Sequence, residues 1–357
     1  MTSYNKRILV TGGAGYIGSN TTCQLLDAGY DVVVVDNLCR GNREAVDPAR
    51  LRVVDLLDTD GLAGVMNEKP CEAVIHFAAY SAVGESMKVP EIYFGNNTGG
   101  SLSLLTAMLR AGIGKIVLSS TAAVYGMPEN VPIPEAEPRA PVNTYGESKV
   151  MVETMLDWFD RIHGMRSVCL RYFNAAGADP KGRAGEDHEP ETHLIPLLFR
   201  AALTGKPITL FGDDYATPDG TCIRDYIHVT DLAQAHIAAL EWLSGGGASK
   251  KYNVGTGHGF SVKEVLGAVE KVTGKKVPFE MGPRRDGDPA VLVADSTRLQ
   301  RELGWRAEYS DLERIVETAW GWANRKTPAA ENRGAGEFMR DRTLNRPLVD
   351  KGLFRDE

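Results

Sequence analysis

Short apolar runs alternate with longer amphipathic stretches through the first half of the chain. The apolar runs are rich in Val and Ile without regular polar positions, as in strands buried on both faces of a parallel sheet. They predict strands at Arg7–Thr11, Asp31–Asp36, Leu51–Val54, Ala73–Phe77, Lys115–Ser119 and Ser167–Arg171. The stretches between them predict helices at Tyr16–Ala28, Asp58–Asn67, Glu91–Ala111 and Tyr145–His163. This order predicts an α/β fold of the Rossmann type, with a doubly wound parallel sheet.

The pattern changes after about Phe173, where loops become longer and richer in Pro, Gly and charge. Helices are predicted at His193–Leu203, Thr230–Leu243, Val262–Val272 and Asp311–Asn324, with a short strand at Ile208–Phe211. We interpret residues 1–175 as one domain, to which segments around 225–255 return, and residues 176–326 as mainly a smaller C-terminal α/β lobe. The charged tail 327–357 is expected to be flexible.

Composition limits the kinds of partner. The net charge of −7 argues against a nucleic-acid partner. No stretch approaches the roughly 20 apolar residues of a membrane helix, and the first residues do not resemble a signal peptide. The five cysteines are scattered and form no Cys-x-x-Cys pair, which favours reduced thiols in the cytoplasm and predicts no metal site.

A glycine-rich loop follows the first predicted strand and opens the first helix. Gly12, Gly15 and Gly18 permit a tight turn and close approach of the backbone, including Tyr16 and Ile17, to a pyrophosphate. A tight turn without a ligand is the alternative. Asp36 ends the second strand, where its carboxylate would accept hydrogen bonds from ribose hydroxyls and repel a 2′-phosphate. These positions predict an NAD site.

Tyr145 and Lys149 lie four residues apart and share one face of a predicted helix. A tyrosine with a pKa of about 10 is a poor base, but a neighbouring ammonium and the positive nicotinamide ring would favour its phenolate. Such a base could remove a proton from a sugar hydroxyl. Thr121 follows the fifth strand and is our choice for a third catalytic group. Ser119 and Ser120 remain possible as hydrogen-bonding residues of the strand end with structural roles.

Further motifs follow in order, and they resemble a known family. They are Gly12–Gly18, Asp36–Leu38, His76–Ala79, Val83–Ser86, Ser119–Gly126, Tyr145–Lys149, Arg171–Asn174, Arg224–Val229 and Arg285–Asp288. From about Lys6 to Arg325 the chain is similar to the UDP-glucose 4-epimerases of the extended short-chain dehydrogenase/reductase family. The resemblance implies that the NAD site also includes Asn37, Asp55, Leu56, Phe77, Ala78, Ala79, Asn96, Ser119 and Phe173, besides Tyr145 and Lys149.

The same resemblance implies reversible epimerisation at carbon 4 of a UDP-hexose, with NAD tightly held and not consumed. It assigns the substrate to Thr121, Asn174, His193, Leu194, Phe211, Arg224, Arg285, Asp288 and Leu292. The resemblance places Leu292 beside the substituent on carbon 2 of the sugar. Its bulk predicts a preference for UDP-glucose and UDP-galactose over their N-acetyl forms. Many family members have a lysine where this chain has Ser81. A homodimer joined through a helix bundle is also implied.

Other functions compete with this interpretation. Related dehydratases carry an Asp-Glu pair directly after the strand-end threonine, where this chain has Ala122 and Ala123, so dehydration is disfavoured. A 4-epimerase of a UDP-pentose, UDP-glucuronate or an N-acetylated UDP-sugar remains open. A non-catalytic NAD-binding regulator is a further alternative, because a fold alone does not establish activity.

Overall fold

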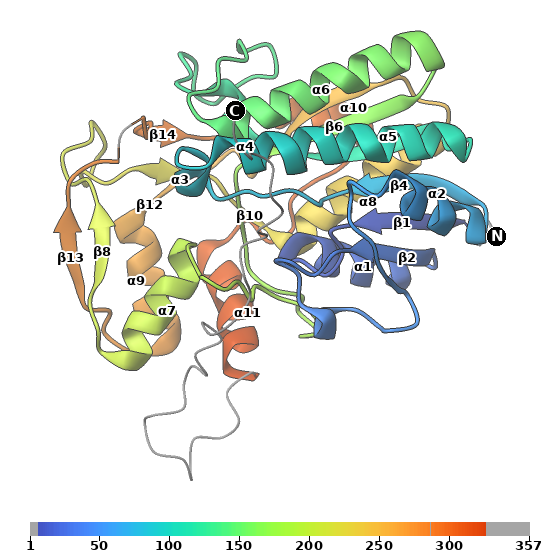
Figure 1. The fold of residues 1–357 in the computed structure, drawn as a ribbon. Helices are drawn as coiled ribbons and strands as arrows, with labels where there is room; N and C mark the ends of the chain where they lie inside the picture. Colours follow the sequence, from blue (N-terminus) through green and yellow to red (C-terminus); the bar gives the residue numbers. More distant parts are fainter. Residues whose placement is uncertain (1–5, 286, 326–357) are drawn as a thin grey trace, which may run out of the picture.

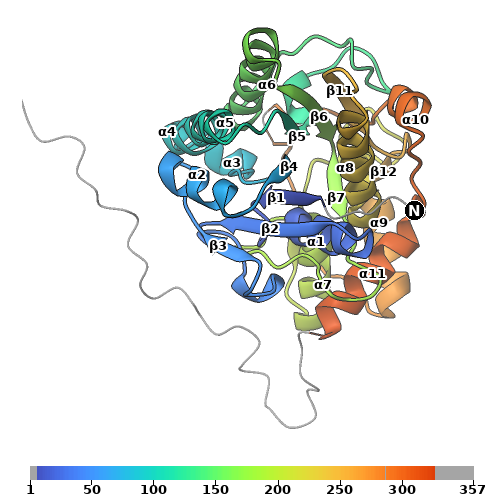
Figure 2. The same cartoon turned by 90° about the vertical axis from the view of Figure 1, so that its right-hand side faces the viewer.

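A computed structural model of the chain describes residues 6–285 and 287–325. Its centre, seen within the whole fold in Figure 1, is a seven-stranded parallel sheet in the order β11-β6-β5-β4-β1-β2-β3, and Figure 2 labels these strands. The strands are β1 (Arg7–Thr11), β2 (Asp31–Asp36), β3 (Leu51–Val53), β4 (Cys71–His76), β5 (Lys115–Thr121), β6 (Arg166–Tyr172) and β11 (Lys250–Val254). This sheet confirms the predicted α/β class. The chain changes direction across the sheet between β1 and β4, and ligands of such folds gather at the carboxyl ends of the strands there.

Helices cover both faces of the sheet, as Figure 2 shows. On one face lie α1 (Tyr16–Asp27) and α8 (Val229–Ser244), whose Leu25 and Leu240 belong to the same apolar core as Val34 of β2. On the other face lie α2 (Thr59–Glu68), α5 (Gly100–Arg110) and α6 (Thr144–His163). Two separate apolar cores therefore hold the sheet, and both faces are closed to water.

The later part of the chain forms a third apolar core around α7 (Leu194–Thr204), α9 (Val262–Thr273) and α11 (Leu312–Arg325). Its strands pair in small groups: β7 (Asn174–Ala176) with β10 (Tyr226–His228), β8 (Ile208–Phe211) with β13 (Phe279–Gly282), and β9 (Ile223–Arg224) with β12 (Phe260–Ser261) and β14 (Val291–Leu292). Helix α10 (Thr297–Leu303) contacts β11. The functional division into an NAD domain and a UDP-sugar lobe stays a prediction.

The helix predicted over Glu91–Ala111 is present, but it is not α-helical throughout. The structure has α4 (Pro90–Tyr93), which is followed by the π-helix η2 (Phe94–Gly99) and then by α5. The side chain of Asn97 points inward from the π-turn, where its Oδ1 accepts a hydrogen bond from the Tyr80 N–H at 2.8 Å. Its Nδ2 donates to Ser148 Oγ at 3.0 Å. Single π-turns of this kind often mark functional sites.

Other differences concern elements that the pattern did not predict and the ends of predicted ones. The helices that it did not predict are η1 (Arg43–Ala45), α3 (Val83–Ser86), η3 (Ala122–Tyr125) and α10, and β11 of the central sheet was not among the predicted strands. Strand β5 continues two residues beyond its predicted end, so that Thr121 is its last residue. Within the described part of the chain, no helix combines the length and the apolar character needed to cross a bilayer. The tail 327–357 lies outside the described residues.

Candidate active site

The glycine turn between β1 and α1 is built by close backbone contacts. Gly12 has φ +69°, and a Cβ there would lie 2.5 Å from the backbone nitrogen of Ala78. A Cβ on Gly18 would lie 2.3 Å from the carbonyl oxygen of Gly12. Any side chain at either position would push the turn apart, whereas glycine permits it. The turn therefore lies directly against the segment after β4.

Helix α1 begins at this turn without a side-chain cap. Its N-cap is Gly15, so the amides of the first turn, including those of Tyr16 and Ile17, have no acceptor from a capping side chain. Such amides, together with the helix dipole, favour an anion. The residues of the turn therefore fit the pyrophosphate of a dinucleotide.

Asp36 lies at the end of β2, beside the glycine turn. Its carboxylate oxygens accept hydrogen bonds from the Ala14 N–H at 3.0 Å and the Leu38 N–H at 2.8 Å. Each oxygen keeps a second lone pair, so the carboxylate can still accept from ribose hydroxyls. Burial raises the pKa of Asp36 and these two bonds oppose the rise. Leu38 has φ +62°, an unusual conformation for a bulky residue, at the edge of this site.

Other predicted cofactor residues follow the same strand edge. Asn37 donates to Asp55 Oδ2 at 2.8 Å, which joins the ends of β2 and β3. Leu56 is buried, and the Phe77 N–H donates to the Thr11 carbonyl at 3.0 Å. Asn96 donates to its neighbour Asn97. The structure thus brings the ends of β1, β2 and β4 together.

Tyr145 stands in the first turn of α6, next to the end of β5. Asn143 caps this helix by accepting the Gly146 N–H at 2.8 Å. A Cβ on Gly146 would lie 2.5 Å from the Ala123 carbonyl oxygen, so only glycine lets α6 approach the η3 turn this closely. Burial raises the pKa of Tyr145 to about 12, while a hydrogen bond with the Thr121 hydroxyl lowers it. The structure thus brings Tyr145 and Thr121 together.

Lys149 is buried one helical turn beyond Tyr145. Its Nζ donates to the Ser119 carbonyl at 2.9 Å, which ties α6 to β5. Burial lowers the pKa of Lys149 to about 8, although Cys169 and Glu153 raise it. These protein groups leave Tyr145 protonated near neutral pH. The predicted lowering of its pKa therefore requires a further positive charge beside the phenol.

Two buried polar networks support this centre, and the sequence interpretation assigned neither. In the first, His76 bridges Thr11 Oγ1 at 2.6 Å and Ser101 Oγ at 3.0 Å, linking β1, β4 and α5. Burial and, to a smaller extent, the charge of Lys149 together lower the pKa of His76 to about 3, so the ring is neutral. The polar residue in the predicted strand end His76-Phe77 was the only sequence signal for this network.

The second network joins Glu153 of α6 to Arg171 of β6. Their side chains form a buried ion pair at 2.6 Å, and Ser120 Oγ donates to Glu153 at 2.7 Å. Arg171 also donates to the Tyr125 hydroxyl at 2.9 Å. Arg171 opens the motif Arg171–Asn174 of the resemblance, and its guanidinium is committed to this pair. Glu153 lies four residues after Lys149 on the same helix face, and that spacing could have revealed it.

Arg224 and Asp288 come together on the predicted substrate side. They form an ion pair at 2.5 Å, and Arg224 also donates to the Pro289 carbonyl at 2.8 Å. The guanidinium of Arg285 lies 4.3 Å from the ring centre of Phe211. Cation and aromatic residue thus form one surface, as at many sites for planar or anionic ligands.

Leu292 connects this side to the catalytic turn. It pairs with Arg224 in the register of β14 and β9. Together with Phe173 it packs against the apolar cluster of Ala122 and Val124 that follows Thr121. The structure therefore places Leu292 between the predicted nucleotide anchor and the end of β5.

Asn174 and His193 occupy other positions. The Asn174 N–H donates to the Asp225 carbonyl at 3.0 Å, which holds β7 beside β10. His193 occupies the N-cap position of α7 without a side-chain capping bond, and its Nδ1 contacts the carboxylate of Glu186. Leu194 begins α7 and packs against the third core. Their predicted contacts with UDP stay predictions.

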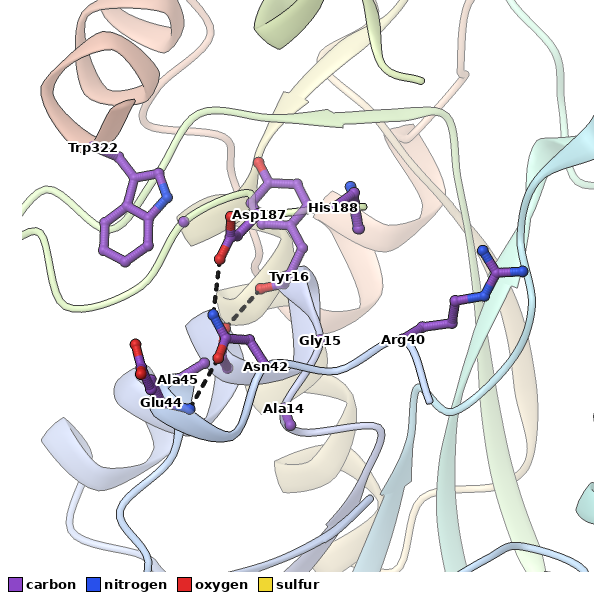
Figure 3. A pocket seen from close by; sticks show the side chains of 12 residues that line it. Ala14, Gly15, Tyr16, Arg40, Asn42, Glu44, Ala45, Asp187, His188 and Trp322 are labelled. Carbon is purple, nitrogen blue, oxygen red and sulfur yellow. Dashed lines mark hydrogen bonds between the residues drawn. The ribbon is translucent and has the colours of Figure 1, made fainter. Parts of the chain in front are cut away.

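A pocket lies beside the start of α1, where two distant segments meet. Figure 3 shows Gly15 and Tyr16 on one side and Asp187 and His188 on the other. Asn42 donates to Asp187 Oδ2 at 2.8 Å across this pocket. The segment before α7 is therefore held against the glycine turn.

Comparison with known proteins agrees with this geometry. The chain belongs to the NAD dependent epimerase/dehydratase family, whose model matches residues 8–255. It is 53% identical to a UDP-glucose 4-epimerase of Lacticaseibacillus casei over 317 residues, which are 88% of this chain and 96% of that protein.

Two solved structures are similar along nearly their whole length. UDP-glucose 4-epimerase from Brucella ovis in complex with NAD has a TM-score of 0.86 and 46% identity, covering 89% of this chain and 98% of that one. The enzyme from Bifidobacterium longum in complex with NAD+ and UDP has a TM-score of 0.85 and 39% identity, covering 90% and 98%.

Proposed function

We propose that the protein interconverts UDP-galactose and UDP-glucose by reversible epimerisation at carbon 4, with NAD as a bound and regenerated cofactor. The observation that carries this proposal is the contact of Tyr145 with Thr121 at the carboxyl end of β5, above the buried Lys149. The strand end lies two strands from the glycine turn in the same sheet. A proton-transfer group and a dinucleotide site therefore share one edge of the sheet.

The residues fit NAD at the glycine turn. Gly12, Gly15 and Gly18 permit a tightly packed turn whose backbone amides could approach the pyrophosphate, and the carboxylate of Asp36 would accept hydrogen bonds from the adenosine ribose. Bound NAD supplies a reversible acceptor for the hydride of carbon 4. Its positive ring would provide the charge that Tyr145 needs to lose its proton.

Tyr145 acts as acid and base in turn. It removes the proton of the 4-hydroxyl and later returns it to the 4-oxygen, while Thr121 keeps the phenol oriented. Lys149 fixes α6 against β5 through the Ser119 carbonyl. The sugar must turn between the two transfers, so this part of the site grips the substrate weakly.

The residues that bind the substrate tightly are expected to contact its UDP part. We assign the UDP contacts to Asn174, His193, Leu194, Phe211, Arg224, Arg285 and Asp288. Arginine forks match phosphate oxygens, and the Arg224–Asp288 pair holds one fork in a fixed direction. Leu292, between this side and Thr121, would crowd an N-acetyl group at carbon 2.

We further propose a cytoplasmic homodimer joined through α5 and α6. Both helices expose large apolar side chains at helical spacing: Leu102 and Leu109 on α5, and Met151, Trp158 and Ile162 on α6. Trp158 and Ile162 are 54% and 65% exposed. Patches of this kind on a folded protein mark interaction surfaces. Two copies packed through these helices would bury them in a four-helix arrangement.

Incubation of the purified protein with UDP-galactose, without added NAD, tests the function. NMR of the products should reveal UDP-glucose at the equilibrium ratio, because the cofactor is retained. UDP-N-acetylgalactosamine and UDP-xylose serve as parallel substrates. Faster turnover of either would reassign the sugar, and absence of any turnover with NAD-loaded protein would refute the epimerase proposal.

A further inference from the structure

Four potential metal ligands meet on one short segment before α7. Glu186, His188, Glu191 and His193 lie within residues 186–193, and each offers one ligand atom to the group. These four atoms all lie within 4.8 Å of one another. His188 Nδ1 is 3.1 Å from Glu186 Oε1, and His193 Nδ1 contacts the same oxygen. Glu191 Oε2 is 3.8 Å from His188 Nδ1.

The two imidazole rings converge edge to face. Their centroids are 5.1 Å apart and their planes make an angle of 88°, so each directs a ring nitrogen to the Glu186 carboxylate from a different side. Ligands around a tetrahedral zinc ion, at about 2.0–2.1 Å from the metal, are about 3.3 Å from each other. Small shifts of these four side chains would therefore satisfy that geometry.

The surroundings hold the segment in place. Trp322 of α11 donates its indole N–H to the Glu186 carbonyl at 2.9 Å. The Tyr16 ring of α1 lies 6.0 Å from the His188 ring at 87°. The carboxylate of Glu186 is largely buried, with 9% of its side chain exposed. The cluster is thus supported by helices on both sides of it.

From this geometry we propose that Glu186, His188, Glu191 and His193 bind one Zn2+ ion. Two imidazoles favour zinc over magnesium or calcium, and two carboxylates balance its charge. Four protein ligands fill a tetrahedral shell and leave no position for a substrate, so the ion is structural. The spacing of the cysteines predicts no metal site, and no cysteine belongs to this cluster.

The ion would fix the conformation of residues 186–193, which lead into α7, because all four ligands come from that segment. Hydrogen bonds from Asn42 and Trp322 hold the segment against its neighbours. Coordination through Nδ1 leaves the Nε2–H of His193 as its remaining donor, because a bound nitrogen cannot carry a proton. The metal would therefore fix the orientation and tautomer of a residue that we assign to UDP. The metal proposal itself does not depend on the epimerase activity, since binding is measured directly.

Metal analysis of the full-length protein without an affinity tag tests the proposal. After incubation with Zn2+ and gel filtration, mass spectrometry of the metal should find about one zinc ion per chain. The His188→Ala and Glu186→Gln variants should each lose most of it. His163→Ala, which removes an exposed histidine at the end of α6, should retain the wild-type content.

Cobalt substitution provides a measurement on the unmodified chain. Co2+ in place of Zn2+ should give the intense visible absorption of a tetrahedral site, and equimolar Zn2+ should abolish it. Chelation should lower the Tm of the wild type and leave that of His188→Ala unchanged. Zinc-free wild type after gel filtration, or full zinc content in His188→Ala, would overturn the proposal.

Discussion

The cofactor end and the substrate end of the site are held by different means. At the cofactor end the main chain sets the geometry, because Gly12 lies against Ala78 and two backbone amides hold Asp36. At the substrate end, side chains far apart in the sequence set it, as Arg224 does with Asp288, 64 residues away. The cofactor end has no space for an added atom, whereas the substrate end depends on the charge and the length of its side chains. Substitutions should therefore damage the two ends differently.

Tyr145→Phe should have the largest effect, and it should leave both ends intact. The variant keeps the ring but loses the proton carrier, so kcat should fall by about 100- to 10,000-fold. Bound NAD and the affinity for UDP should change little. Tyr309→Phe is the matched control, since its ring stacks on His228 and should keep its packing and full activity. A Tyr145→Phe enzyme with near-normal kcat would remove Tyr145 from the mechanism.

Gly12→Ala should break the cofactor end. The new Cβ meets the backbone of Ala78 at a left-handed position, which we expect to cost about 2–4 kcal/mol of unfolding free energy. NAD should be lost during purification. Urea unfolding and the NAD content of denatured protein measure both effects. Gly64→Ala is the control, because nothing lies within 4 Å of its added Cβ, and it should keep its NAD.

Arg224→Lys should weaken the substrate end alone. Lysine keeps the positive charge but lacks the planar guanidinium, so we expect the variant to lose about 1.5–3 kcal/mol of charge-assisted hydrogen bonding. That corresponds to a KM for UDP-galactose about 10- to 100-fold higher. Steady-state kinetics together with the NAD content measure this. Loss of NAD in this variant would contradict the separation of the two ends.

A pH measurement sharpens the comparison inside the cofactor end. The pKa of His76 is about 6.5 in the unfolded chain and about 3 in the folded one, so between these values the unfolded state binds more protons. Stability should therefore fall as the pH decreases below 6.5, by about 1.4 kcal/mol per pH unit from this residue. His236 and His228, whose pKa values burial also lowers, add to the slope.

His76→Gln should reduce that slope by one proton and leave the contributions of the other two histidines. Urea unfolding between pH 4 and about 7, a range set by these pKa values, measures the difference between variant and wild type. An unchanged slope would mean that His76 is already protonated in the folded protein.

How well each feature could be predicted from the sequence depends on whether it is set by neighbouring residues or by residues far apart in the chain. The sheet and the glycine turn were predictable because buried strands and glycine spacing leave local patterns. Asn97 was not, because an asparagine in a helical stretch gains meaning only from Tyr80 and Ser148, which the fold brings to it. The roles of Arg171 and Glu153 likewise depended on a contact between β6 and α6 that no local pattern contains.

The long separation within the Arg224–Asp288 pair also affects how the chain is made. Once Val254 has left the ribosome, all seven strands of the central sheet exist, with the glycine turn and Asp36 among them. Domains generally begin to fold during synthesis from the N-terminus. The ion pair of Arg224 cannot form until translation has continued far enough for Asp288 to emerge. The nascent chain should therefore acquire its dinucleotide site well before its sugar-nucleotide anchor.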